Sequence, residues 1–536
     1  MKRNHEKRAV TLIILTIVAG TAFSQISGTK SVGAGGDYET LSAAVADVMG
    51  NGISGHTILE LKDGYDENET FIIGNYPGND QYNLSIRPEA GADQVIIRSA
   101  HFEIIRIDSA KHVIIDGRAG GTGSQNVLTM ISEFNGNGDA IGIWNQSEKN
   151  MIRNCNLLFD CNRGIFMRDA DSTTITECDI STLSEGPVTN NTCIGIQINQ
   201  CENNIISNNV IHNLHVNHDE FTVNGIDYEN YNDVGSNDSF YNNFICLNMD
   251  RSDSTSVIQG INFWNSAETE NPINILFNTI IIGGTNASMS GNSYGIYDRE
   301  IKRLVNIQNN IVINTRTNSS GTGTHYAICK EKLYGSWTSD YNLLVATGDS
   351  GMIGGYMGTD CITLQDWQDS TGFDSHSVSK ELVFKDPVDG DLHLTDASFD
   401  DPDLKCLPVT GITTDIDGDL RDDKAPYKGA DELVAESVSL PLDPASITPF
   451  RFALEQAYPN PFNPETTIQF EVKKFCHVVL KVYNMVGQEV VTLNDQYYEP
   501  GTYKSIFNAS GLSSGIYYYR IQMDNFQAVK KMVILK

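Results

Sequence analysis

The chain has 536 residues, with 68 acidic and 37 basic side chains and a formal net charge of −31. Because phosphate binding needs a basic surface, this charge argues against a nucleic-acid partner. The acidity instead suits a soluble surface outside the cell, and it offers carboxylates to divalent cations. The ten cysteines form no CxxC pair, so we expect no zinc site.

Residues 1–24 are predicted to form a cleaved signal peptide. Basic residues precede an apolar run from Ala9 to about Ala19, and Ala22-Phe-Ser24 provides a small-x-small cleavage site. The apolar run is too short to span a bilayer, and no later segment is a candidate. We therefore expect no transmembrane segment in the mature chain.

The mature chain begins with a glycine-rich stretch at 32–38 and a helix pattern at 40–48, for which Thr40 is the expected N-cap. Short alternating patterns then predict strands. They lie at 56–61, 84–87, 95–97 and 112–117.

A single phrase recurs between Gly142 and Thr347: Gly-Ile, a few residues, a turn, and then an Asn-rich apolar segment. The openings are Gly142, Gly164, Gly195, Gly225, Gly260, Gly295 and Ala327. They follow one another at intervals of 22 to 35 residues. A repeat of this length indicates a stacked array of similar units.

Within each repeat, apolar residues alternate with polar ones, which indicates strands with one buried face. Such a strand cannot bury its apolar face alone, so successive repeats must stack, with asparagines in one column. The expected column is Asn154, Asn208/Asn209, Asn242/Asn243, Asn278 and Asn309/Asn310. This pattern resembles the right-handed parallel β-helix, the fold of pectate lyases and many surface proteins. The resemblance implies such a solenoid over 25–435, with an N-terminal cap and a C-terminal closing hairpin.

The end of this region is rich in aspartate, in Asp389-Gly-Asp-Leu-His-Leu394 and again from Asp415 to Asp431. An EF-hand loop would need a carboxylate eleven residues after Asp415, and that position is Pro426. The stretch resembles the closing hairpin found after many bacterial β-helices. Ca²⁺ remains an alternative as a cofactor.

A Pro-punctuated linker is predicted at 436–449, followed by a separate module at 450–536. Short alternating strands predict a small antiparallel, immunoglobulin-like sandwich, so the fold class is all-β. The strand patterns lie at 467–472, 478–484, 487–493, 501–503, 515–521 and 530–536. This ordered set resembles the type A sorting domain of the type IX secretion system. The resemblance implies contact with that machinery in a Bacteroidota-type bacterium and a secreted or cell-surface location.

The Gly-Ile strands carry the candidate site. If the Ile after each glycine points inward, the third and fifth residues point outward. A carboxylate pair with arginines is the candidate catalytic group: Asp227, Glu229, Arg168 and Arg299. Aromatic rings and amides suited to sugars are the candidate substrate-binding group: Trp144, Phe166, Asn199, Asn262, Trp264 and Tyr297.

Two further features have a structural and a chemical interpretation. His212, His215 and His218 are spaced as metal ligands on a helix, but a polar loop enforces no such geometry, so we assign no metal ligands. Cys155 with Cys178, and Cys161 with Cys193, are either disulfides or buried thiols.

We therefore expect an exported, monomeric β-helix protein that binds an extended polysaccharide along its strand face. One alternative is a polysaccharide lyase or glycoside hydrolase that uses the same carboxylates and arginines. A protein adhesin is the other alternative. No motif decides whether the chain is an enzyme.

Overall fold

The structure is a computed structural model that describes most of the chain. The described residues are 25–183, 192–216, 220–230, 237–248, 255–265, 271–286, 291–319, 322–433, 453–454, 457, 459–472, 476–485, 488–498, 501–523 and 526–535. The predicted signal peptide and linker lie outside them. The chain divides into two compact units, Met1–Val434 and Ala435–Lys536. Each is described by itself.

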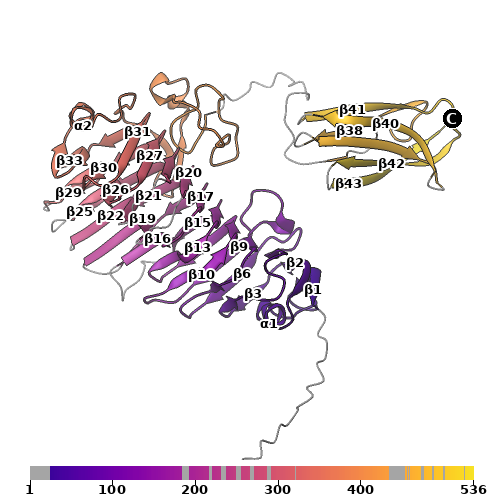
Figure 1. The fold of residues 1–536 in the computed structure, drawn as a ribbon, viewed down its shortest axis with the longest axis horizontal. Helices are drawn as coiled ribbons and strands as arrows, with labels where there is room; N and C mark the ends of the chain where they lie inside the picture. The colour runs from indigo at the N-terminus through magenta and orange to yellow at the C-terminus, as the bar shows by residue number, and fades with distance from the viewer. Residues whose placement is uncertain are drawn as a thin grey trace, which may run out of the picture. The chain divides into compact units, whose positions relative to one another are not determined.

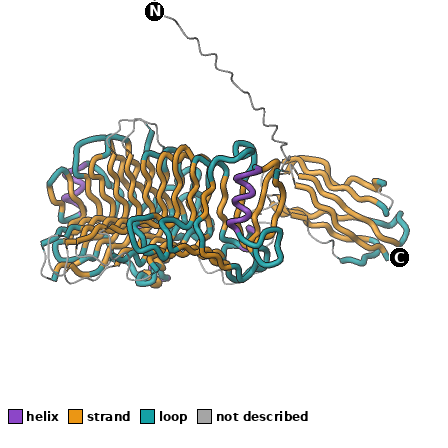
Figure 2. The backbone as a smooth tube through the Cα atoms, turned by 90° about the horizontal axis from the view of Figure 1, so that it is seen from below, coloured by secondary structure: helices purple, strands orange, loops and turns teal. Residues whose placement is uncertain are grey.

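The first unit is a solenoid of parallel strands in three long sheets, which confirms the predicted all-β architecture (Figures 1 and 2). Sheet A contains β1 (Ile26–Val32), β2 (Ile53–Leu61), β5 (Leu84–Pro88), β8 (Val113–Asp116), β11 (Met151–Arg153), β14 (Thr174–Thr176), β17 (Ile205–Ser207), β20 (Ser239–Tyr241), β23 (Ile273–Leu276), β27 (Leu304–Gln308) and β31 (Ser336–Asp340).

Sheet B contains β3 (Asp66–Asn68), β6 (Val95–Ser99), β9 (Leu128–Ser132), β12 (Cys155–Phe159), β15 (Asp179–Thr182), β18 (Val210–His212), β21 (Phe244–Asn248), β24 (Thr279–Gly283), β28 (Ile311–Asn314) and β32 (Leu343–Ala346). Sheet C contains β4 (Phe71–Ile73), β7 (Ile105–Asp108), β10 (Asp139–Glu148), β13 (Arg163–Asp171), β16 (Thr192–Asn199), β19 (Glu220–Asn230), β22 (Thr255–Asn265), β26 (Ser293–Glu300), β30 (His325–Lys330), β33 (Gly351–Tyr356) and the antiparallel β34 (Thr359–Cys361). A short pair, β25 (Thr285–Asn286) and β29 (Thr317–Asn318), lies beside them.

The interior of the solenoid is apolar, as the alternation predicts, and one turn adds a column of amides. Each Nδ2 donates to the Oδ1 of the next coil at 2.9–3.1 Å, and the last reaches Asp374. The column is Asn209, Asn243, Asn278, Asn310 and Asn342. Cys178 precedes it, with its backbone N–H donating to Asn209 Oδ1. Buried amides are costly unless paired, so this ladder specifies the stacking.

The structure corrects one part of the predicted Asn column. Asn154 and the first member of each Asn pair adopt left-handed backbone conformations, with φ between 52° and 62°. They form the turn before the ladder, which is a conformation that asparagine tolerates better than most residues. Cys155 takes the ladder position in that coil, and its register pairs it with Cys178. Nine of the ten cysteines are free thiols, and all nine are buried.

Each end of the solenoid has a helix (Figure 2). Helix α1 (Leu41–Asn51) begins at the predicted N-cap, Thr40, whose side chain accepts from Ala43 N. Helix α2 (Leu364–Thr371) buries Trp367 in the main core and has a capping box at Thr363. Both helices cover apolar coils that an open end would expose to water.

The aspartate-rich segment does not cross the open end. It contains the hairpin β35 (Phe384–Asp386) and β36 (Asp391–Leu394) and two 3₁₀ turns, Asp396–Ser398 and Pro402–Leu404. Another 3₁₀ turn, Ala119–Gly121, lies between β8 and β9. The segment runs back along the outer face of sheet B. Apolar side chains of the segment and of sheet B form one cluster. The cluster includes Phe244, Ile281, Ile313, Val345, Leu392, Leu394, Leu404 and Tyr427. The predicted closing hairpin therefore lies on the side of the solenoid.

The second unit consists of small antiparallel sheets with their own core. Its strands are β37 (Ala453–Leu454), β38 (Glu465–Val472), β39 (Cys476–Tyr483), β40 (Glu489–Tyr498), β41 (Gly501–Asn508), β42 (Gly515–Met523) and β43 (Phe526–Ile534). One sheet has the order β37-β38-β41 and the other β40-β39-β42-β43. Two layers with a shared apolar cluster agree with the predicted antiparallel module.

Candidate functional site

The outer face of sheet C carries the predicted site residues in two rows. One row pairs Phe166, Gln197, Asp227, Asn262 and Tyr297 across neighbouring strands. The second pairs Trp144, Arg168, Asn199, Glu229 and Trp264. The alternate residues, such as Ile226 and Tyr228, are fully buried in the core. The predicted inward and outward sorting therefore holds on these strands.

A glycine interrupts the alternation on β13, β16, β19, β22 and β26, whereas on β10 the same position is Ala140 and Gly142 pairs with Phe166. The pairing of β16 with β19 omits Gly195 and Gly225, because Ile194 pairs with Asn224 and Ile196 with Ile226. A Cβ on Gly195 would lie 2.6 Å from the Gly225 carbonyl oxygen, so a larger residue does not fit. Both strands have one residue at this position, so the register does not shift. The glycine faces inward, toward Ile211, and the side chain before it points outward. Strict alternation missed these outward side chains, which include Arg163, Asn224 and Tyr294.

Asp227 lies at the centre of the amide-rich part of this face. Its Oδ2 accepts from Gln197 Nε2 at 2.8 Å, and its Oδ1 accepts from Asn262 Nδ2 at 2.6 Å. The residue is only 3% exposed. Burial raises the pKa of the Asp227 carboxyl, although the hydrogen bonds from Asn262 and Gln197 act in the opposite direction. Asp227 is thus well placed to orient its neighbours.

Glu229 is more accessible than Asp227 and accepts from Asn199 Nδ2 at 3.1 Å. Burial, together with the charge of Asp227, raises the pKa of Glu229 to about 7. Arg163 and Arg299 oppose this shift. A carboxyl that titrates near neutral pH is suited both to hydrogen bonding with hydroxyls and to general acid–base chemistry.

Aromatic rings border the carboxylates on the C-terminal side. Arg299 lies over the Trp264 ring, 4.7 Å from its centroid. The Tyr294 ring stacks on Tyr297 at 4.0 Å and on Tyr326 at 5.3 Å. A pocket of about 390 Å³ adjoins this stack, lined by Thr222, Val257, Asn292, Tyr294, Tyr297, Arg299 and Glu331. Tyr297 also donates its hydroxyl proton to Glu331.

Three predicted residues, Trp144, Phe166 and Arg168, lie on β10 and β13, at the N-terminal end of the two rows. The Trp144 and Phe166 rings contact each other at 4.7 Å, and Trp144 Nε1 donates to Glu103 at 3.0 Å. Arg168 is half exposed, and its closest acidic partner is Asp169 at 3.8 Å. Arg163 instead donates to Gln197 at 3.0 Å, so it is the arginine next to Asp227. The arginine immediately before Gly164 would have indicated this role if the interrupted alternation at the glycine had been recognised.

The spaced histidines, to which no metal was assigned, and the aspartates of the predicted closing hairpin have partners of their own. His212 contacts Asp179 at 3.0 Å, whereas His218 lies outside the described residues. Asp415 is 1% exposed, and its carboxylate accepts from the backbone N–H groups of Asp417, Asp419 and Glu432. It therefore shapes its own turn. In the part of the chain that is described, one group has the spacing of metal ligands: His393, Asp417 and Asp431.

The second unit gives the decisive comparison. The family model described as a secretion system C-terminal sorting domain matches residues 456–535. Residues 456–535 are a C-terminal sorting domain. This module of the type IX system marks the protein for export, and the protein is secreted or held at the cell surface. The predicted recognition and location are confirmed.

No curated protein matches the chain. A solved structure of a pectin methylesterase from Aspergillus niger, in deglycosylated form, is similar over 69% of this chain and 95% of that chain. The identity is 12% and the TM-score is 0.22, so the likeness carries no argument about activity. Among the described residues, no helix has the length and apolar character needed to cross a membrane.

Proposed function

We propose that the exported solenoid binds an extended polysaccharide along the outer face of sheet C. The observation that carries this proposal is the continuous group formed by Asn199, Glu229, Trp264, Arg299 and the tyrosine-lined pocket. Aromatic faces suit the apolar faces of sugar rings, and amides and carboxylates suit their hydroxyls. Trp264 and the tyrosines of the pocket provide the aromatic faces, and Asn199 and Glu229 provide the hydrogen-bonding groups.

The parallel register gives the site the shape of a chain-like ligand. Neighbouring strands lie about 4.8 Å apart, so side chains in one row recur along the solenoid axis. The paired rows continue through β13, β16, β19, β22 and β26. A linear ligand laid along this axis would meet one outward side chain per coil. A small compact ligand would use only the pocket.

Charge favours a neutral glycan over a polyanion. The chain carries a formal net charge of −31, and a strongly anionic polymer would be repelled at low ionic strength. Arg299 provides a local cation, but Glu229 and Glu331 lie beside it. We therefore expect binding to neutral polysaccharides first, with weaker and salt-dependent binding to uronate polymers.

Catalysis at the same place is the second candidate, and the raised pKa of Glu229 favours it. Glycoside hydrolysis uses two carboxyl groups with different protonation states. Asp227 is buried with both oxygens hydrogen-bonded, so Glu229 is the group able to exchange protons with a substrate. In this case Glu229 would be the acid–base group, with Asp227 as a positioning residue.

Binding and turnover on one glycan panel separate these candidates. The exported protein and Glu229→Gln are tested for binding to neutral and acidic polysaccharides, and for new reducing ends or unsaturated products. Binding without products supports the binding function. Products that Glu229→Gln abolishes support catalysis. Absence of binding to every polysaccharide contradicts both.

A further inference from the structure

A second polar site lies over sheet B rather than sheet C. It is formed where the 378–433 segment covers the outer face of sheet B. The His393 ring packs edge-on against Phe244 of β21, with centroids 4.9 Å apart. A Cβ on Gly390 would lie 2.7 Å from the His212 ring, so the hairpin turn rests directly on β18. These contacts fix the position of His393 relative to the solenoid.

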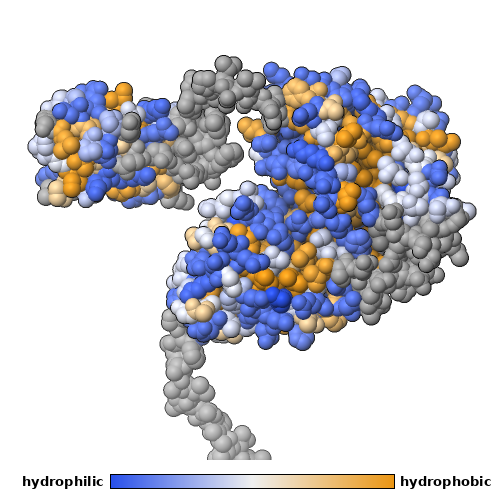
Figure 3. All heavy atoms as spheres, turned by 180° about the vertical axis from the view of Figure 1, so that it is seen from behind, coloured by the Kyte–Doolittle hydropathy of each residue, from blue (hydrophilic) through white to orange (hydrophobic). Residues whose placement is uncertain are grey.

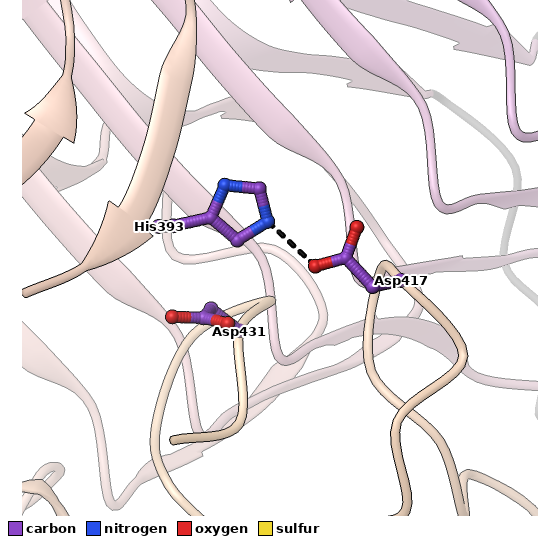
Figure 4. Close-up of side chains that lie close together, drawn as sticks. All are labelled: His393, Asp417 and Asp431. Carbon is purple, nitrogen blue, oxygen red and sulfur yellow. Dashed lines mark hydrogen bonds and ion pairs between the residues drawn. The ribbon is translucent and has the colours of Figure 1, made fainter. Parts of the chain in front are cut away.

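Two carboxylates from other parts of the segment converge on this imidazole (Figure 4). His393 Nε2 lies 2.6 Å from Asp417 Oδ2. Asp431 is 7% exposed, and its Oδ2 accepts from Leu394 N at 2.7 Å, which fixes the carboxylate beside the ring. The candidate ligand atoms of the three residues all lie within 4.8 Å of one another.

The opposite nitrogen of the ring has a separate partner. His393 Nδ1 contacts the carboxylate of Asp391. In metal sites, a carboxylate on one imidazole nitrogen commonly fixes the tautomer that leaves the other nitrogen as a ligand. A metal that replaces the bond between His393 Nε2 and Asp417 would therefore meet three candidate ligand side chains and a fourth that orients the histidine. Lys385 supplies opposing positive charge to Asp417 and Asp431.

An independent observation comes from the adjoining pocket of about 310 Å³. His393 and Asp417 line this pocket, together with Asn154 and Asn208. Asn154 is 3% exposed. The side-chain oxygens of both asparagines are buried and accept no hydrogen bond from the described residues. Buried acceptors are normally paired, so these two oxygens indicate a bound group that donates hydrogen bonds, such as metal-coordinated water.

We propose that His393, Asp417 and Asp431 bind a Zn²⁺ ion that has an open coordination position toward this pocket. Zn²⁺ takes nitrogen and carboxylate ligands and is commonly held by three side chains and a water. Ca²⁺ prefers six to eight oxygen ligands, and imidazole favours a transition metal. The ion links β36 to the turns at Asp417 and Asp431. It therefore cross-links three parts of the segment that covers sheet B.

The cluster escaped sequence analysis because its members come from separate turns. No short motif connects His393 with Asp417 and Asp431, which follow it by 24 and 38 residues in the sequence. A second His–Asp pair provides a matched control. His376 Nδ1 contacts Asp340 Oδ2 at 2.7 Å and is not part of a three-ligand group in the described chain.

The experiment measures Zn²⁺ binding to the untagged exported protein by calorimetry and by metal content after dialysis. The variants are Asp417→Asn, His393→Gln, Asp391→Asn and, as the matched control, Asp340→Asn. Asp417→Asn and Asp340→Asn remove the same charge from a His–Asp pair, so both alter general cation attraction equally. Circular dichroism and the Tm in chelator show whether each variant is folded.

Wild type and Asp340→Asn should bind a single Zn²⁺ ion per chain and show a higher Tm with Zn²⁺. Asp417→Asn and His393→Gln should bind at least about tenfold more weakly, and Asp391→Asn about 10–100-fold more weakly. Equal affinity in Asp417→Asn and Asp340→Asn would overturn the proposal. So would an equal effect of Ca²⁺ and Zn²⁺ on the wild-type protein.

Discussion

The outer faces of sheets B and C come from the same coils and the same alternation, yet they have different surroundings. On sheet B, outward residues such as Phe244 and Ile281 are apolar and packed beneath the 378–433 segment. On sheet C, the outward residues are amides, carboxylates and aromatic rings, and the described residues place no segment over them. Polar and apolar surface patches alternate on the side of the molecule seen in Figure 3. The apolar outer face of the solenoid is therefore buried beneath a segment of its own chain, whereas the polar outer face is accessible to ligands.

The largest expected effect is on the covered face. Arg421 is buried, pairs with Glu432 at 3.3 Å and donates to Asn242 Oδ1 at 2.8 Å. Arg421→Ala leaves Glu432 buried without its cation, which should lower the free energy of unfolding by about 3–5 kcal/mol. All four tryptophans lie in the solenoid, so fluorescence during urea unfolding follows this unit alone.

The matched control is an arginine on the open face. Arg168→Ala should change the free energy of unfolding by no more than about 0.5 kcal/mol, because Arg168 is half exposed. Equal effects of the two substitutions would show that the segment over sheet B contributes little to stability.

A smaller effect is expected on ligand binding by the open face. Trp264→Ala should weaken glycan affinity by about tenfold, because a stacking surface beside Arg299 is lost. Phe399→Ala is the control, since Phe399 is 41% exposed on the segment that covers sheet B. Titration calorimetry with the glycan found in the panel measures both. A larger loss for Phe399→Ala would place the ligand on the other face.

The smallest effect is a pH dependence of stability. The pKa of Glu229 is raised from 4.5 to about 7, so the folded protein holds this proton more tightly than the unfolded chain. Wild type should therefore lose stability relative to Glu229→Gln as the pH rises from about 4.5 to about 7, with a constant difference above. Between these two pH values, the Tm of Glu229→Gln should rise by about 2 °C relative to the Tm of wild type. A difference that does not change with pH would mean that Glu229 titrates normally.

Much of the fold could be predicted from sequence because its causes are local. Alternation decided which residues of each strand enter the core, and Ile226 and Tyr228 are buried as expected. Thr40 starts a helix because its hydroxyl accepts from a backbone N–H only three residues ahead. The sorting domain could be recognised because its strand patterns are contiguous.

The candidate site was predicted less completely. Asp227, Glu229 and their amide neighbours were found because they share one phase of the alternation. Arg163 and Tyr294 were missed because the glycine that follows each of them faces inward, like the isoleucine after it, so the alternation is interrupted there. Whether a glycine adopts this conformation depends on contacts with the next coil, such as the close approach of Gly195 to Gly225.

The repeat, the buried and exposed phases of its strands and the export module could all be predicted from the sequence, since each follows from spacing along a short stretch of chain. The folded chain was needed to show which face is covered, which arginine lies beside Asp227, and that His393 meets Asp417 and Asp431. These are contacts between segments tens to hundreds of residues apart, as in the bond from Arg421 to Asn242. Such contacts depend on packing of the whole solenoid, and no local pattern encodes them.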